Sequence, residues 1–209
     1  MRSLTPGRPD MQKIFYPVLF ALLCHVSPVH AFDFNPLGYI KGAVEAVAED
    51  RSSSDIGKDT KIKASIVSKI TDQMGSDVVS VSSDVYEQDV MLTGIVETLK
   101  QKQQASGIAK LVKGVKKVYN EIIVHKKNDK DKGAVEGFVD DTVIEKKTNA
   151  LLLEGKNVNV TNFRWRSVGG HVFLFGRALS KTELNKAIKI VKSIKGVSKV
   201  TSRVKVKAK

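Results

Sequence analysis

Apolar residues along the chain follow helical spacing and strand spacing in turn. Isoleucines recur every four residues between positions 62 and 70, which is the spacing of one helix face. Valine and leucine then alternate with polar residues, which is the spacing of a half-buried strand, before the helical spacing returns. The pattern predicts, in chain order, a helix at 59–74, strands at 79–85 and 90–96, a helix at 105–112 and a strand at 118–124.

The same pattern returns 82 positions later without a gap. Three blocks keep this register: Asp59-Thr60-x-Ile62 on Asp141-Thr142-x-Ile144, Val90-x-Leu92-x-Gly94 on Val172-x-Leu174-x-Gly176, and Gly114-Val115-x-x-Val118 on Gly196-Val197-x-x-Val200. A period near 80 residues is too long for a stacked solenoid, so each copy is expected to be a small domain.

The order of elements predicts an α+β fold of two tandem αββαβ domains. Because the strand, helix, strand step crosses over right-handedly, each copy should form a three-stranded mixed sheet with both helices on one face. The other face of each sheet stays open. In the second copy, Phe173 and Phe175 alternate with the buried positions and would lie on that open face. Two interpretations stay open: they contact a partner or a membrane, or they pack against the first copy.

Paired glycines and acids mark backbone features in both copies. Gly94 and Gly176 interrupt the middle strand, which predicts a backbone passing too close for any side chain. Gly114 and Gly196 are predicted to close the second helix of each copy in the left-handed conformation. Asp59, and Asp140 or Asp141, are predicted to cap the first helices.

The first 31 residues have the pattern of an export signal. Lys13 precedes an apolar run from Ile14 to Cys24, and small residues near Ala31 suit cleavage there. An uncleaved membrane span would need about 20 apolar residues. Met11 is a second candidate start. The predicted organisation is a signal peptide at 1–31, an extension with a short amphipathic helix at 32–57, a first domain at 58–126, a charged linker at 127–137 and a second domain at 138–209.

Charge is distributed unevenly over a chain of 209 residues and formal net charge +13. Residues 32–138 hold 16 basic and 16 acidic residues, whereas 139–209 hold 16 basic and 5 acidic ones. This asymmetry favours a second copy that faces a polyanion, which for an exported protein means anionic phospholipid, lipopolysaccharide phosphate or acidic cell-wall polymer. Lysines that merely solubilise a small domain are the alternative. The candidate anion-binding residues are Lys146, Lys147, Arg164, Arg166, Lys181, Lys186, Lys189 and Lys192.

Sequence motifs for catalysis or cofactor binding are absent. Cys24 is the only cysteine and lies in the predicted signal, and only His125 and His171 follow that signal. No metal-binding spacing, nucleophile elbow, phosphate loop or dinucleotide fingerprint occurs. We therefore expect a binding module with no catalytic residues, no metal, no cofactor and no small-molecule substrate.

The three repeated blocks resemble the BON domain, a bacterial module, over residues 58–126 and 138–207. The resemblance implies an αββαβ fold, an envelope location, and phospholipid binding linked to envelope integrity or osmotic protection. One departure is Lys146-Lys147-Thr148-Asn149, which stands where the first copy has Ala64-Ser65-Ile66-Val67. Because small residues do not precede Cys24, the chain resembles the soluble, osmotically induced periplasmic type more than the lipoprotein type.

Two functions of different classes follow. The leading hypothesis is a periplasmic, non-enzymatic protein whose basic second domain docks on an anionic phospholipid membrane. The alternative is an adaptor or holdase-like stress protein that contacts envelope proteins through Phe173 and Phe175. Nucleic acid is not expected as a partner, because export removes the protein from it.

Overall fold

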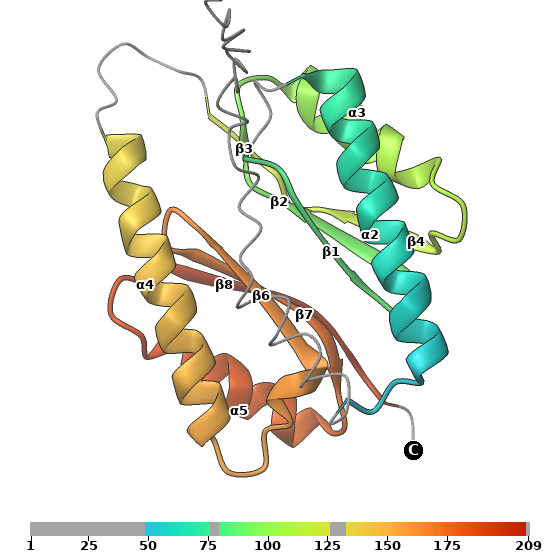
Figure 1. Ribbon diagram of the computed structural model, residues 1–209. Coiled ribbons are helices and arrows are strands. Elements are labelled where there is room, and N and C mark those ends of the chain that lie inside the picture. Colours follow the sequence, from blue (N-terminus) through green and yellow to red (C-terminus); the bar gives the residue numbers. More distant parts are fainter. Residues whose placement is uncertain (1–48, 76–79, 126–132, 208–209) are drawn as a thin grey trace, which may run out of the picture.

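The computed structural model describes residues 49–75, 80–125 and 133–207. The predicted signal peptide, the amphipathic helix before residue 48 and most of the charged linker lie outside these residues. The described chain forms two α+β units, the first up to residue 125 and the second from residue 133 (Figure 1). The first unit contains helix α2 (Ser53–Met74), strands β1 (Ser82–Tyr86), β2 (Asp89–Thr93) and β3 (Ile95–Val96), helix α3 (Leu99–Lys110), and strands β4 (Lys117–Asn120) and β5 (Ile123–Val124).

The second unit repeats this order with longer strands. It contains helix α4 (Gly133–Glu154), a 3-10 turn η2 (Val160–Asn162), strands β6 (Phe163–Val168) and β7 (His171–Ala178), helix α5 (Lys181–Lys192) and strand β8 (Lys199–Val206). Helix α4 therefore begins within the segment predicted as linker. None of the helices in the described ranges combines the length and the apolar character needed to cross a bilayer.

Each unit has the predicted mixed sheet. In the first, β1 is antiparallel to β2 and β2 is parallel to β4; in the second, β6 is antiparallel to β7 and β7 is parallel to β8. The short parallel pair β3 and β5 extends the first unit beyond its sheet. The tandem αββαβ prediction is thus confirmed.

Gly94 and Gly176 mark the close approach that the sequence predicts. Their φ angles are 121° and 111°, values that residues with a side chain rarely adopt. A side chain at Gly94 would overlap the carbonyl oxygen of Ser80, and one at Gly176 would overlap that of Asn162. The equivalent glycines Gly114 and Gly196 also have positive φ after their helices.

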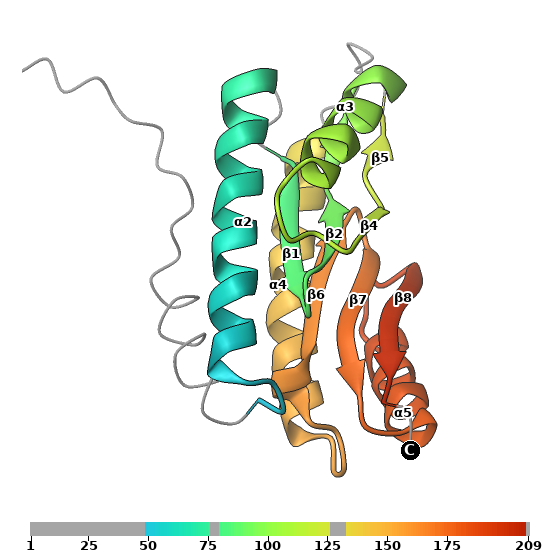
Figure 2. The ribbon, with the colours of Figure 1, turned by 90° about the vertical axis from the view of Figure 1, so that its right-hand side faces the viewer.

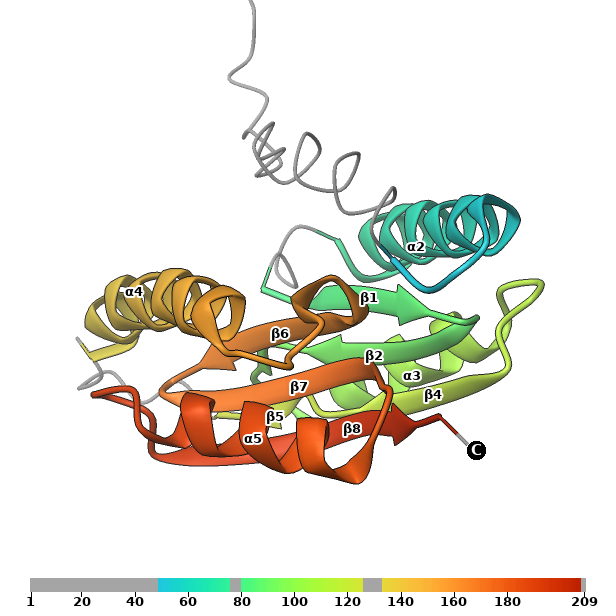
Figure 3. The same cartoon turned by 90° about the horizontal axis from the view of Figure 1, so that it is seen from below.

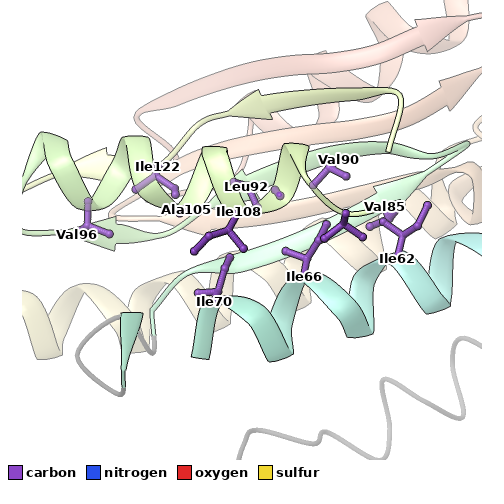
Figure 4. Close-up of a cluster of buried hydrophobic side chains, with 12 residues drawn as sticks. Ile62, Ile66, Ile70, Val85, Val90, Leu92, Val96, Ala105, Ile108 and Ile122 are labelled. Atoms are coloured by element: carbon purple, nitrogen blue, oxygen red, sulfur yellow. The ribbon is translucent and has the colours of Figure 1, made fainter. Parts of the chain in front are cut away.

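Helices cover one face of each sheet. Isoleucines of α2 pack with β1, β2 and α3 in the first core, which Figure 4 shows in close-up. Figure 2 shows α4 and α5 on the same side of β6, β7 and β8. The second core has Ile144 and Leu152 from α4 together with Ala187 and Val191 from α5.

The open faces of the two sheets pack against each other. Figures 1 and 3 show the result as four layers, with helices outside and both sheets between them. Phe173 and Phe175 are 1% and 2% exposed and form a third apolar cluster with Tyr86, Met91 and Val168. The two phenylalanines therefore pack against the first unit. Their prediction as a contact surface for a partner or membrane is wrong, because the first sheet covers them.

Helix α2 begins earlier than predicted. Ser52 is its N-cap, and the Ser52 hydroxyl accepts a hydrogen bond from the Asp55 backbone N–H at 3.1 Å. Asp59 lies nearly two turns inside the helix, and Asp141 lies well inside α4 in the same way. The capping prediction for Asp59 and for Asp140 or Asp141 is therefore wrong, since none of the three stands at a helix start.

Candidate functional site

A lysine-rich helical layer covers the second sheet. We define the second layer as α4, α5, the loop that follows α4 and the loops that flank α5. Lys146 and Lys147 project from α4 into solvent, and the Lys186 ammonium hydrogen-bonds the carbonyl of Lys156 while remaining partly exposed. The sequence placed six candidate lysines here and missed Lys156 and Lys195, which lie in loops without helical periodicity. The exposed lysines of this layer are Lys146, Lys147, Lys156, Lys181, Lys189, Lys192 and Lys195.

Amphipathic packing sets the direction of these lysines. Ala187 and Val191 are buried on the inner face of α5, and Lys181, Lys189 and Lys192 are exposed on the other face. Ser180 caps the helix by accepting a hydrogen bond from the Glu183 backbone N–H at 3.0 Å. In α4, Thr148 occupies a buried position between Ile144 and Leu152, so it interrupts the apolar face that Ile66 continues at the equivalent position of α2.

Leucines are exposed among these lysines. Leu153 is 67% exposed near the end of α4, and Leu151 and Leu179 are also exposed on the same layer. Apolar side chains beside cations are typical of surfaces that lie at a membrane interface. The layer thus offers both charge and insertable apolar groups.

Arg164 and Arg166 do not belong to this layer. Arg166 Nε donates a hydrogen bond to Asp84 Oδ2 of the first unit at 3.0 Å, and Arg164 forms an ion pair with Glu49. Both arginines are on the sheet face that meets the first unit. Their prediction as phosphate ligands is wrong, because carboxylates of the first unit occupy them.

Further ion pairs join the first unit to the second. Arg177 lies 2.6 Å from Glu87 and 3.1 Å from Asp50, while the Lys207 ammonium is also 3.1 Å from Asp50. Two more pairs complete this set, Arg203 with Glu121 at 2.6 Å and Lys205 with Asp89 at 2.7 Å. The surplus of bases in the second unit is therefore partly consumed at the interface.

Burial and charge shift the pKa of groups in this interface. Burial opposes ionisation of Asp84, but the charges of Arg166 and Lys63 outweigh it and hold the Asp84 pKa well below its usual value. Burial raises the pKa of Tyr86 to about 12. Burial also raises the pKa of Glu145, which lies beside Arg166.

The pairing changes how the charge count is interpreted. Six of the ten described acidic residues of the first unit pair with bases of the second: Glu49, Asp50, Asp84, Glu87, Asp89 and Glu121. Although basic and acidic residues balance in the first unit, many of its acids line the interface. Its outer surface therefore presents more lysines than acids, which the residue count did not indicate.

The repeated aspartates hold the hairpin turns. The two carboxylate oxygens of Asp59 accept hydrogen bonds from the backbone N–H groups of Glu87 and Gln88 at 2.7 and 2.8 Å. Asp141 accepts equivalent bonds from Gly169 and Gly170 at 2.6 and 2.9 Å. All four turn residues have positive φ, and their N–H groups lie outside the strand ladder, so the aspartates supply the acceptors. The recurrence of these aspartates in the repeat was the sequence signal for this role.

Catalytic or metal-binding geometry is not evident in the described residues. No group of three or more His, Cys, Asp or Glu side chains is placed there to hold a metal ion. A small cavity of about 150 Å³ opens between the units, lined among others by Thr93, Glu145 and Arg166. Its arginine is already paired with Asp84 and lies 4.0 Å from Glu145.

Comparison with known proteins matches this architecture. The BON domain model matches residues 58–126 and 140–208, together about two thirds of the chain. The chain belongs to the BON domain family. The resemblance indicated by the repeated blocks is thus confirmed.

Three relatives are similar to this chain over most of its length. An uncharacterized protein of Anaplasma centrale is 35% identical over 128 residues, covering 61% of this chain and 82% of the relative. Osmotically-inducible protein Y of Escherichia coli K12 is 31% identical over 147 residues, covering 70% of each chain. A 21 kDa hemolysin of Actinobacillus pleuropneumoniae is 26% identical over 156 residues, covering 75% of this chain and 71% of the relative.

Proposed function

We propose that this BON protein is exported, has no enzymatic activity and docks on anionic phospholipid surfaces through its second layer. The observation that carries the proposal is the outward display of seven exposed lysines and several exposed leucines on α4, α5 and their loops. Among the described residues of this layer, Glu154 is the exposed acid. Phosphate head groups and acyl chains are the partners that such a mixture suits.

The energetics favour useful but salt-sensitive binding. Each lysine close to an anionic bilayer contributes about 1 kcal/mol, and this contribution falls off within a Debye length of about 8 Å at physiological salt. Only the lysines that face the bilayer at one time contribute. Partial insertion of Leu153 adds an apolar component that salt does not screen.

Protection of the cell envelope during osmotic stress is the physiological role we propose. The similarity to osmotically-inducible protein Y supports this role, and the export pattern of residues 1–31 supports a periplasmic location. N-terminal sequencing of the mature protein from a periplasmic fraction should begin at Phe32. Recovery of the unprocessed chain from the cytosol would contradict the proposal.

Co-sedimentation with vesicles tests the docking itself. The protein should pellet with vesicles of phosphatidylglycerol in phosphatidylcholine at low salt, and much less at high salt or with phosphatidylcholine alone. Equal binding to neutral vesicles at every salt concentration would contradict electrostatic docking.

A site-specific probe tests the docking surface. The mature chain from Phe32 with Leu153→Cys has one thiol, because Cys24 is the only native cysteine and lies in the predicted signal. An environment-sensitive fluorophore on that thiol should shift to the blue on anionic vesicles and remain unchanged on neutral ones. Binding without a shift would mean that the second layer does not contact the bilayer.

A further inference from the structure

We infer that the protein has two opposed docking faces and bridges two anionic bilayers. This inference rests on the proposed function and extends it to the outer surface of the first unit. We define the first layer as α2, α3 and the loops that flank α3. No motif in the first copy indicated this surface, because its acidic and basic residues balance in number.

The arrangement of the sheets places the two layers on opposite sides. Because the open faces of both sheets meet, α2 and α3 lie on one outer side and α4 and α5 on the other (Figures 1 and 3). The buried cluster around Phe173 and the ion pairs such as Asp84 with Arg166 hold this arrangement. A single flat bilayer that contacts one layer therefore leaves the other layer exposed to solution.

Exposed lysines also outnumber acids on the first layer. Of the four other described acids of the first unit, Asp59 is buried beneath the hairpin turn, and Asp55, Asp72 and Glu97 remain on this outer side. Its exposed lysines are Lys58, Lys61, Lys63, Lys69, Lys100, Lys110, Lys113 and Lys116, of which Lys63 is paired with Asp84. The first layer thus has a positive excess of its own, smaller than that of the second layer.

Leucines also appear independently on the first layer. Leu99 is 60% exposed at the start of α3, and Leu111 is 85% exposed directly after it. The positions equivalent to these leucines in the second unit are Lys181 and Ser193, so the repeat did not impose them. The exposed leucines of the two units thus stand at different positions of the repeat, in each case beside lysines. This supports an interfacial role for the first layer as well as the second.

Vesicle clustering tests the inference. Addition of the protein to small vesicles containing phosphatidylglycerol should raise their apparent size in dynamic light scattering. Clustering should reverse at high salt and decline when excess protein covers every vesicle, since each molecule then finds no second bilayer. Complete co-sedimentation without any rise in size would overturn the inference and leave the proposed function standing. Absence of co-sedimentation would count against the proposed function itself.

Layer-specific variants identify the faces. Lys61→Gln, Lys69→Gln and Lys110→Gln remove charge from the first layer, and Lys181→Gln, Lys189→Gln and Lys192→Gln remove it from the second. Each triple variant should still pellet with anionic vesicles but lose clustering at least tenfold, whereas the matched Lys→Arg triples should cluster as the parent does. Combining both Gln triples should abolish pelleting. Clustering that survives in either Gln triple would indicate bridging by self-association and would overturn the two-face inference.

Discussion

Asp84 and Arg166 occupy equivalent positions in the two units and form an ion pair with each other across the interface. They are 82 residues apart, the period of the repeat, and Glu121 and Arg203 form a second pair with the same separation. Contacts between equivalent residues place these residues close to the axis that relates the two units. Because the same sheet face of each unit meets its counterpart, this axis is an approximate twofold. Two identical units would bring like charges together at these points. Divergence to opposite charges therefore makes the pairing of unlike units specific.

Exchange of the charges at the more exposed pair tests this specificity. Glu121→Arg places two cations together and should lower the melting temperature by a few degrees, because the pair is partly solvated and worth at most about 1 kcal/mol. Adding Arg203→Glu recreates an opposite pair and should restore most of the loss. Thermal unfolding followed by circular dichroism measures both. Equal melting temperatures for the single and double variants would contradict a direct interaction.

Removal of Phe173 tests the apolar part of the interface. Phe173→Ala should cost about 3–5 kcal/mol of unfolding free energy, because the side chain is buried between the sheets and leaves a cavity. Leu153→Ala is the matched control and should change stability by less than about 0.5 kcal/mol, because Leu153 is largely exposed. Urea denaturation measures both values. A small effect of Phe173→Ala would mean that the units do not pack in solution as they do here.

The sequence predicted what depends on local spacing. The four-residue recurrence of Ile62, Ile66 and Ile70 fixes one helix face, and alternation fixes the strands, so the order of elements and the sheets follow from it. Gly94 was also recognisable, because a glycine within an alternating strand usually marks a bulge or a close approach of another backbone. The helix start was missed because Asp59 is as plausible a cap as Ser52 when only the sequence is known.

Contacts between the units could not be predicted from the number of acidic and basic residues in each copy. The equal numbers of acids and bases in the first copy did not indicate that six of its acids pair with the second unit while most of its lysines lie on the outer side. Overlay of the repeat does contain a signal, because Asp84 falls on Arg166 and Glu121 on Arg203. Opposite charges at equivalent positions become interpretable only when the units are expected to face each other. The lysines of α5 were placed correctly because helix amphipathicity alone decides their direction.

Acid titration should reveal the role of Asp84. Its pKa is lowered in the folded chain from an ordinary value of 3.8, so its stabilising contribution is complete above about pH 4 to 5 and is lost as pH falls through the folded pKa. The unfolding free energy should therefore decline as the pH falls below about 4. Asp84→Asn should be less stable at pH 7 and show a shallower decline, as measured by urea denaturation from pH 2 to 7. Parallel profiles for the two proteins would show that Asp84 is not the titrating group.

Glycine substitutions separate the close approach at Gly94 from ordinary glycine positions. Gly94→Ala should prevent folding or cost more than about 3 kcal/mol, because the added methyl group would overlap the Ser80 carbonyl oxygen at a φ of 121°. Gly107 lies inside α3 with open space around it, so Gly107→Ala should raise stability by about 0.5–1 kcal/mol through helix propensity. Thermal unfolding of the two variants beside the parent measures both effects. If Gly94→Ala folded with parental stability, the backbone of β2 and that of the segment before β1 would have to be farther apart than in this structure.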